Sequence, residues 1–219
     1  MLGIILTGGE GPSAQVIKQL IETKTKDGIL LAAADSGLEK AENAGLTPDW
    51  IIGDFDSLDD SSRLDSYPPE RVIRLQCDKD YTDTELAVMH TFKQGCNDVW
   101  IIGGGGGRID HLFAIRSLLE RKQFPCRWIT DTADIHCIEA DNEICFDRNK
   151  ETTVSVFPLG TGPWEAGSSG LKWTLDGLPW DCGFFGLSNR APDGKFSVKI
   201  EKGRFMVILP GLEEACQQL

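Results

Sequence analysis

The sequence predicts an α/β fold, in which an N-terminal Rossmann-like parallel sheet with helices on both faces is followed by a small C-terminal antiparallel β-sandwich. Three observations predict it. Short apolar runs alternate with amphipathic stretches through residues 1–131, which is the rhythm of a parallel sheet covered by helices. These runs are apolar nearly throughout, as strands buried on both faces are. Residues 132–219 instead carry strand-length runs separated by Gly, Pro, Asp and Asn, which is typical of a sandwich.

The first region, residues 1–131, supplies strands and helices in alternation and is expected to form one domain. The expected strands are Gly3–Thr7, Ile29–Ala34, Trp50–Gly53, Arg71–Leu75, Asp98–Gly103 and Arg127–Thr130. The expected helices are Ser13–Thr23, Ser36–Ala44, Thr82–Gln94 and Arg108–Lys122. Two helices begin with the spacing of a capping box, Ser36 with Glu39 and Thr82 with Glu85.

The second region, residues 132–219, shows no convincing helix before the tail and is expected to form the second domain. Its expected strands are Ile135–Ala140, Glu143–Phe146, Thr152–Phe157, Leu171–Leu175, Phe184–Leu187, Phe196–Glu201 and Arg204–Leu209. Lys202-Gly203 is expected to form a hairpin turn between the last two. The domain boundary falls near Asp131–Asp134, without a flexible linker.

Composition excludes several classes of function. Lys and Arg total 22 against 34 Asp and Glu, so the net charge of −12 argues against a nucleic-acid surface. An anionic substrate therefore needs a bound cation to offset its repulsion by the protein, whereas a cationic substrate is attracted by the negative charge of the protein. No apolar run approaches the roughly 20 residues of a membrane span, and Met1–Leu6 lacks the basic lead of a signal peptide. Seven cysteines without a C-x-x-C pair predict reduced thiols and a cytoplasmic location.

Five aspartates lie in two short segments, each of which follows an expected strand: Asp54, Asp56, Asp78, Asp80 and Asp83. Carboxylates this close raise each other's pKa unless a cation lies among them. Side chains two apart on extended backbone point the same way, so Asp54 and Asp56 can reach one cation with Phe55 turned inward. Taken alone, this pair is equally well explained by an Asx-type turn. With Asp80 and Asp83 at a neighbouring strand end, where ligands bind to such sheets, we favour a magnesium–phosphate site.

A run of five glycines, Gly103–Gly107, stands between an expected strand and an expected helix. Such a run lets backbone N–H groups approach phosphate oxygens at a helix N-terminus, and Arg108 can add a bidentate contact. A purely structural loop is the alternative, since the P-loop pattern is absent. Asp110 can ligate metal or polarise a nucleophile, while His111 is a supporting hydrogen-bonder or a proton carrier.

Two segments near these carry competing interpretations. Lys79 either meets a phosphate or balances the aspartates beside it. The spacing Gly9-x-Gly11-x-x-Ala14, with Asp35 at the end of the second strand, is a passable dinucleotide fingerprint. Pro12 removes one of the N–H donors that a pyrophosphate would use, and the fingerprint leaves the aspartates unexplained. It is the weaker interpretation.

In the second region, Trp173 and the pair Ser188-Asn189 stand out. Trp173 either packs in the core, as strand tryptophans commonly do, or stacks on an aromatic or cationic ligand. Ser188 and Asn189 either bind a ligand or close a turn.

Several motifs in register, spread over nearly the whole chain, resemble those of thiamine pyrophosphokinases of the bacterial type. They are, in chain order, Asp35-Ser36-Gly37, Pro48–Ser57, Lys79-Asp80-x-Thr82-Asp83-x-Glu85, Gly106-Gly107-Arg108-x-Asp110-His111, Gly170-Leu171-Lys172-Trp173 and Leu187-Ser188-Asn189. One departure is the all-glycine loop Gly103–Gly107, where another small residue is expected among the glycines.

The resemblance implies an α/β catalytic domain followed by a β-sandwich, and a homodimer with active sites at the subunit interface. It implies transfer of the pyrophosphoryl group of ATP to the hydroxyethyl oxygen of thiamine, with Mg²⁺ as cofactor and AMP released. The magnesium ligands it implies are Asp54, Asp56 and Asp83. The nucleotide site it implies comprises Asp35, Gly37, Lys79, Asp80, Gly106, Gly107 and Arg108. The thiamine site it implies comprises Asp83, Trp173, Ser188 and Asn189. Catalytic roles fall to Asp83, Asp110 and Arg108, with Asp110 or Asp83 as the candidate general base.

Two alternatives stand beside this hypothesis. The first is a pyrophosphokinase for another alcohol, such as a hydroxymethylpterin, which the Lys172-Trp173 and Ser188-Asn189 segments disfavour. The second is a non-catalytic sensor of a nucleotide or thiamine. Binding alone rarely requires so many uncompensated carboxylates, so the acidic cluster disfavours the sensor.

Overall fold

The computed structural model describes residues 1–24, 28–56, 61–76 and 80–211. The chain forms two compact units, Met1–Asp131 and Thr132–Leu219, each of which is described by itself below. Among the described residues, no helix combines the length and the apolar character needed to cross a membrane.

The first unit contains a parallel sheet with the strand order β4-β3-β2-β1-β5-β6. Its strands are β1 (Leu2–Leu6), β2 (Ile29–Ala34), β3 (Trp50–Gly53), β4 (Val72–Arg74), β5 (Asp98–Ile102) and β6 (Arg127–Ile129). The central strands are buried almost from end to end, which explains why they are apolar throughout rather than alternating.

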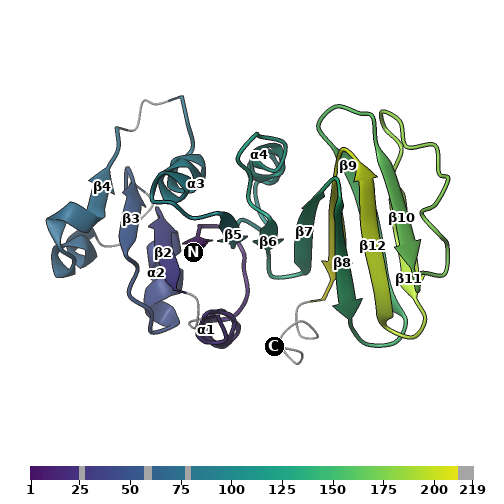
Figure 1. Ribbon diagram of the computed structural model, residues 1–219. Helices are drawn as coiled ribbons and strands as arrows, with labels where there is room; N and C mark the ends of the chain where they lie inside the picture. Colours follow the sequence, from purple (N-terminus) through teal and green to yellow (C-terminus); the bar gives the residue numbers. More distant parts are fainter. Residues whose placement is uncertain (25–27, 57–60, 77–79, 212–219) are drawn as a thin grey trace. The chain divides into compact units, whose positions relative to one another are not determined.

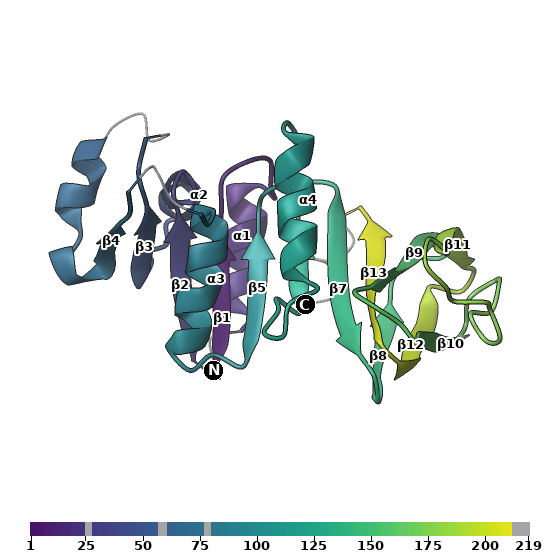
Figure 2. The same cartoon turned by 90° about the horizontal axis from the view of Figure 1, so that it is seen from above.

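Helices cover both faces of this sheet (Figures 1 and 2). They are α1 (Ala14–Glu22), α2 (Gly37–Asn43), α3 (Asp83–Lys93) and α4 (Ile109–Leu118), with 3₁₀ turns at Ser61–Ser66 and Pro69–Arg71. Helices α1 and α2 lie on one face, and α3 and α4 lie on the other (Figure 2). The sequence therefore predicted the fold class of this unit correctly, but it did not indicate the two 3₁₀ turns.

The strand order reverses between β1 and β5, and this reversal positions the site. Leu6 at the end of β1 is opposite Ala33 on β2 and Ile102 on β5. The chain leaves β1 towards β2 on one side, whereas β5 and β6 lie on the other. The loops that follow β1 and β5 therefore diverge from adjacent strands and leave a crevice at the carboxyl edge of the sheet, where open α/β sheets bind ligands.

One of the two predicted capping boxes is wrong. Ser36 has helical dihedral angles and its side chain makes no capping hydrogen bond, because the turn at the end of β2 already runs directly into α2. Thr82 does cap α3, with its Oγ1 accepting a hydrogen bond from the Glu85 N–H at 3.2 Å. The Glu85 carboxylate pairs with Arg121.

The second unit consists of two antiparallel sheets, with strand orders β11-β9-β13-β7 and β10-β12-β8. Its strands are β7 (Ala133–Glu139), β8 (Asn142–Asp147), β9 (Thr152–Leu159), β10 (Glu165–Ser169), β11 (Gly186–Ala191), β12 (Lys195–Lys202) and β13 (Arg204–Pro210). One apolar core joins both sheets, with Val156 and Phe205 from one and Phe196 and Val198 from the other. This is the predicted sandwich.

The structure of this unit differs from the prediction at four places. Residues 171–175 are not a strand, because a side chain, the Asn189 amide, accepts the Trp173 N–H. The sequence missed β10, whose Glu-Ala-Gly-Ser-Ser composition is unfavourable for a strand but which pairs with β12. Lys202-Gly203 is not a hairpin turn, since β12 and β13 belong to different sheets. The expected strand Phe184–Leu187 is displaced to β11.

Candidate functional site

The crevice between the β1 and β5 loops is a cavity of about 500 Å³. Strand ends and helix starts enclose it, since parallel strands deliver their following loops to one edge of the sheet. Its lining includes Thr7–Glu10, Asp35, Ser36, Thr82–Thr84, Gly104–Arg108 and His111. Of the predicted nucleotide-site residues, Asp35, Gly106, Gly107 and Arg108 line this cavity, and so does Asp83.

The glycine run divides into a pinned half and an open half. The N–H groups of Gly103, Gly104 and Gly105 donate to the carbonyl oxygens of Ile129, Gly8 and Glu10 at 2.8, 2.7 and 2.7 Å. Within the part of the chain that the structure describes, the N–H groups of Gly106 and Gly107 donate no such bond.

Both of these glycines have positive φ, 63° at Gly106 and 57° at Gly107, immediately before α4. The part of the loop whose geometry suits an anion is therefore Gly106–Arg108 together with the N-terminus of α4.

Arg108 and Asp110 form a bidentate ion pair at the start of α4. Arg108 Nε donates to Asp110 Oδ1 at 3.1 Å, and its terminal nitrogen donates to Oδ2 at 2.6 Å. The guanidinium lowers the pKa of the exposed Asp110 carboxyl to about 2, chiefly through the hydrogen bond and then through its charge. Asp110 is therefore ionised at neutral pH, accepts protons poorly, and fixes the direction of Arg108.

Three carboxylates meet at the ends of β2 and β3. Oxygen atoms of Asp35, Asp54 and Asp56 all lie within 4.8 Å of one another. The backbone at Asp35 and at Phe55 is left-handed, with φ of 49° and 63°, so the chain turns sharply at both strand ends. Phe55 is buried against Ala33 and the neighbouring core, and this anchors the segment that carries Asp54 and Asp56. Phe55 points inward as expected, although its backbone is not extended.

The Asx-type turn and the acidic cluster coexist here. The Asp56 N–H donates to Asp54 Oδ1 at 3.4 Å, which is the local bond that the alternative interpretation required. An ionised carboxylate has further acceptor positions, so this bond leaves Asp54 able to bind a cation. Three carboxylate oxygens are hard donors at a separation that fits the coordination shell of a divalent cation such as Mg²⁺.

The remaining predicted residues of the first unit lie elsewhere. Asp83 is the first residue of α3, on the cavity wall, and Asp80 is exposed on the loop before it. Gly37, the first residue of α2, is buried, and a Cβ atom at this position would overlap the carbonyl oxygen of Leu6. Its lack of a side chain therefore serves the close approach of α2 to β1. Lys79, like Asp78, lies outside the described residues.

Several residues that shape the crevice were not predicted from the sequence. Thr7 Oγ1 and Thr84 Oγ1 are hydrogen-bonded at 2.6 Å and so join the end of β1 to the first turn of α3. Lys40 Nζ donates to the Gly9 carbonyl at 2.6 Å, and burial lowers the pKa of this lysine. Of these residues, only Thr7 could have been found from the sequence, because it directly follows β1 and precedes two glycines.

The loop after β1 is bound to the glycine run. Glu10 exchanges two backbone hydrogen bonds with Gly105, each of 2.7 Å. The Glu10 N–H group is therefore already engaged. This disfavours the dinucleotide interpretation of Gly9-x-Gly11-x-x-Ala14, in which backbone N–H groups of this loop would face a pyrophosphate.

Apart from Asp83, the predicted thiamine-site residues belong to the second unit. Asn189 is buried, and its side-chain amide makes two hydrogen bonds to the backbone of Trp173. Asn189 Nδ2 donates to the Trp173 carbonyl at 2.6 Å, and Oδ1 accepts a hydrogen bond from the Trp173 N–H at 3.2 Å. Trp173 is 54% exposed, which excludes a core role, and Lys172 Nζ lies 4.7 Å from its ring centroid. Ser188 is exposed with φ of 57° at an irregularity between β11 and β9.

A sequence model of the family described as "Thiamin pyrophosphokinase, catalytic domain" matches residues 21–129. Among curated proteins, the thiamine pyrophosphokinase of Bacillus subtilis (strain 168) is 26% identical over 164 residues. That match covers 69% of this chain and 73% of the Bacillus protein.

Solved structures share the fold over nearly the whole chain. The crystal structure of thiamine pyrophosphokinase from Bacillus subtilis has a TM-score of 0.77 at 23% identity, and covers 96% of this chain and 99% of that chain. The one from Geobacillus thermodenitrificans has a TM-score of 0.74 at 23% identity, with 96% and 98% covered. Yeast thiamin pyrophosphokinase has a TM-score of 0.68 at 17% identity, with 100% and 89% covered. At these identities the likeness establishes the fold.

Proposed function

The chain belongs to the thiamine pyrophosphokinase family through the catalytic-domain sequence of residues 21–129, and we propose that it transfers the pyrophosphoryl group of ATP to thiamine. The hydroxyethyl oxygen of thiamine attacks the β-phosphorus, the bond between this phosphorus and the oxygen carried by the α-phosphorus breaks, and AMP leaves. The hydroxyl proton is lost to solvent or to a neighbouring base. The products are thiamine diphosphate and AMP.

One observation carries the proposal: a group of three carboxylates and a glycine loop that precedes a helix stand at the same edge of one sheet. Asp35 belongs to the carboxylate group and lines the cavity that Gly106 and Gly107 also line. Phosphoryl chemistry needs such a pair, because the transferred group must be positioned and its charge neutralised.

We propose Asp54, Asp56 and Asp83 as the ligands of Mg²⁺, with Asp35 joining them through its position beside the first two. When bound, Mg²⁺ neutralises charge on the phosphate oxygens and orients them for in-line displacement. The chain's own part is to hold the carboxylates close together against their repulsion. The buried Phe55 and the left-handed turns at Asp35 and Phe55 do this.

The nucleotide phosphates are proposed to lie against Gly106, Gly107 and Arg108. The two glycine N–H groups and the N-terminus of α4 attract the phosphate oxygens, and Asp110 holds the Arg108 guanidinium in one orientation. Predicted nucleotide roles also remain for Lys79, Asp80 and Gly37, the last acting by letting α2 approach β1. Of the two candidate general bases, Asp110 is disfavoured because its pKa is too low for that role, and Asp83 can act as one only while its carboxylate does not bind Mg²⁺.

Thiamine is proposed to meet the second unit at Trp173 and Ser188, with Asn189 fixing the Trp173 backbone. The exposed indole offers a face to the cationic, aromatic substrate. The net charge of −12 attracts that substrate as well. We further propose a cytoplasmic homodimer with active sites at the subunit interface.

An acceptor competition experiment tests this function. The protein is incubated with Mg²⁺, ATP and either thiamine or a hydroxymethylpterin, and AMP is quantified by chromatography. We expect AMP to form with thiamine and not with the pterin. Preference for the pterin would establish a different pyrophosphokinase, and tight thiamine binding without AMP would establish a sensor.

A further inference from the structure

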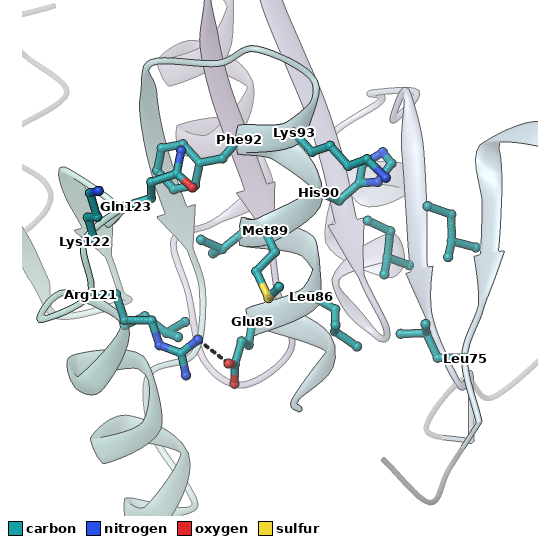
Figure 3. A pocket seen from close by; sticks show the side chains of 14 residues that line it. Leu75, Glu85, Leu86, Met89, His90, Phe92, Lys93, Arg121, Lys122 and Gln123 are labelled. Atoms are coloured by element: carbon teal, nitrogen blue, oxygen red, sulfur yellow. Dashed lines mark ion pairs between the residues drawn. The ribbon is translucent and has the colours of Figure 1, made fainter. Parts of the chain in front are cut away.

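A second cavity runs along α3 and includes no residue of the glycine loop. It is a groove of about 770 Å³ that borders the exposed face of α3, with Leu75 on the β4 side and Arg121 on the α4 side (Figure 3). Met89 and Leu86 project from α3 into it (Figure 3). Its volume falls within the range of small-molecule sites.

The floor of this groove reaches the hydrophobic core. Ile52, Val88 and Leu118 line it and are at most 4% exposed. Met89, in contrast, is 48% exposed on its helix. A floor made of core residues gives the groove depth, which suits a small apolar body better than a flat protein surface.

The charged residues around the groove are mostly basic in a strongly acidic chain. Of its five ionisable residues, Glu85 is the only acid, and the others are His90, Lys93, Arg121 and Lys122. Glu85 is buried and ion-paired with Arg121, so the two charges offset each other (Figure 3). Among the described residues, Lys93 and Lys122 have no ion-pair partner.

His90 adds no charge at neutral pH. Burial and then the nearby Lys93 lower the pKa of its ring, which packs edge-on against Trp50 with centroids 4.4 Å apart. The net charge of the groove therefore comes from the two lysines, in a protein whose overall charge is −12.

We propose that this groove binds a small amphipathic anion, with an apolar body against Met89 and Leu86 and a carboxylate or similar group at Lys93 or Lys122. The apolar floor and the unneutralised lysines are complementary to this class of ligand and to neither a cation nor a neutral polar molecule.

The groove is also connected to the candidate active site by two helices. Thr82–Thr84 at the start of α3 and His111 in the first turn of α4 line the glycine-loop cavity, while α3 from Glu85 to Lys93 and Leu118 at the end of α4 line the groove. A ligand that shifts α3 or α4 is therefore expected to alter nucleotide affinity. By thermodynamic reciprocity, the nucleotide then alters the affinity of the groove by the same factor.

The primary test uses the fluorescent anion 1-anilinonaphthalene-8-sulfonate and three displacing probes with one alkyl chain: decanoate, decanol and decylammonium. We expect decanoate, below its micelle concentration, to displace part of the bound dye. Decylammonium is expected to leave this decanoate-displaceable dye bound. Equal displacement by all three would show that charge plays no role and would overturn the proposal.

Two variants locate the site. Met89→Glu and Lys93→Glu, both at exposed positions of α3, are expected to remove the decanoate-displaceable fraction, while the matched control Lys18→Glu on α1 retains it. Unchanged displacement in both groove variants would place the dye elsewhere. If Met89→Glu instead alters the mass seen by sedimentation and leaves displacement intact, the groove is an interface between copies and the proposal fails.

The coupling is measured separately, as the Kd of a non-hydrolysable ATP analogue with and without saturating decanoate. A shift in Kd that Met89→Glu abolishes supports regulation through α3 and α4, and an unchanged Kd refutes it. None of these readouts requires turnover, so failure here is distinguishable from failure of the proposed activity.

Discussion

At the residue scale, the position of the carboxylates depends on an apolar side chain. Phe55 is buried between Asp54 and Asp56, and its left-handed backbone turns both acids away from the core. Burying a phenylalanine side chain contributes roughly 1.5–3 kcal/mol, which helps to offset the repulsion among the three carboxylates. The cluster is therefore held together by the packing of Phe55 in the core beneath it.

Asp56→Asn tests whether this charge serves catalysis or structure. Turnover is expected to fall by about 100-fold or more, because a metal-binding group contributes several kcal/mol of transition-state stabilisation. The melting temperature is expected to stay the same or rise, since the change relieves repulsion within the 4.8 Å cluster. The measurements are AMP formation and calorimetry. Asp65→Asn, at an exposed acid outside the cluster, is the control. Loss of stability with retained turnover would assign Asp56 to the turn alone.

Trp173 and Asn189 are expected to separate binding from stability. Asn189→Leu leaves the N–H and carbonyl of Trp173 without their bonds, so the free energy of unfolding should fall by about 1–3 kcal/mol. Trp173→Ala, at a 54% exposed side chain, should change it by less than about 0.5 kcal/mol and raise the KM for thiamine. Urea unfolding and steady-state kinetics measure both. Equal destabilisation by the two variants would contradict this division.

The sequence predicted individual acids better than it predicted their grouping. Spacing alone brought Asp54 and Asp56 together, because they are close along the chain. Asp35 joins them through the pairing of β2 with β3, which lies outside the reach of any local pattern. The bond between Thr7 and Thr84 spans 77 positions and was missed for the same reason.

At the element scale, α2 lies against β1 with no room for a side chain at its first residue. Gly37→Ala should lower the free energy of unfolding by about 3 kcal/mol, since the Leu6 carbonyl is backbone and cannot yield easily. Gly107→Ala meets no atom within 4 Å and should cost only about 1–2 kcal/mol, from its positive φ of 57°.

The same pair should rank in the opposite order for ATP binding, because Gly107 lies in the open half of the glycine run. Thermal melts and the KM for ATP measure the two effects. If Gly37→Ala leaves the melting temperature unchanged, the close packing of α2 on β1 is not as the structure has it.

Element prediction succeeded in the first unit and failed in part of the second. Buried parallel strands are apolar throughout, so their composition marks them. In the sandwich, β10 is Glu-Ala-Gly-Ser-Ser and becomes a strand only through pairing with β12. The more apolar residues 171–175 lose that role because side chains on neighbouring segments, such as Ser168 and Asn189, take up their N–H groups.

For the molecule as a whole, the proposed site draws on both compact units of the chain. The carboxylates and the glycine loop belong to Met1–Asp131, and Trp173 belongs to Thr132–Leu219. A homodimer whose sites combine opposite units of two subunits makes a specific prediction for mixed dimers.

The Asp56→Asn and Trp173→Ala proteins are dissociated, mixed and allowed to re-associate. We expect the mixture to be more active than either variant alone. In such a mixed dimer one site carries both substitutions and the other carries neither. The measurement is AMP formation before and after mixing, with sedimentation to count subunits. Absence of any recovery in verified mixed dimers would place each site within a single chain.

Pyrophosphoryl transfer from ATP to thiamine at the carboxylate crevice can be followed by ³¹P NMR of one reaction mixture with Mg²⁺, ATP and thiamine. We expect AMP and thiamine diphosphate to appear in equal amounts with the unaltered protein, and neither to appear at a comparable rate with Asp56→Asn. Formation of ADP with thiamine monophosphate, or unchanged transfer by Asp56→Asn, would contradict this expectation.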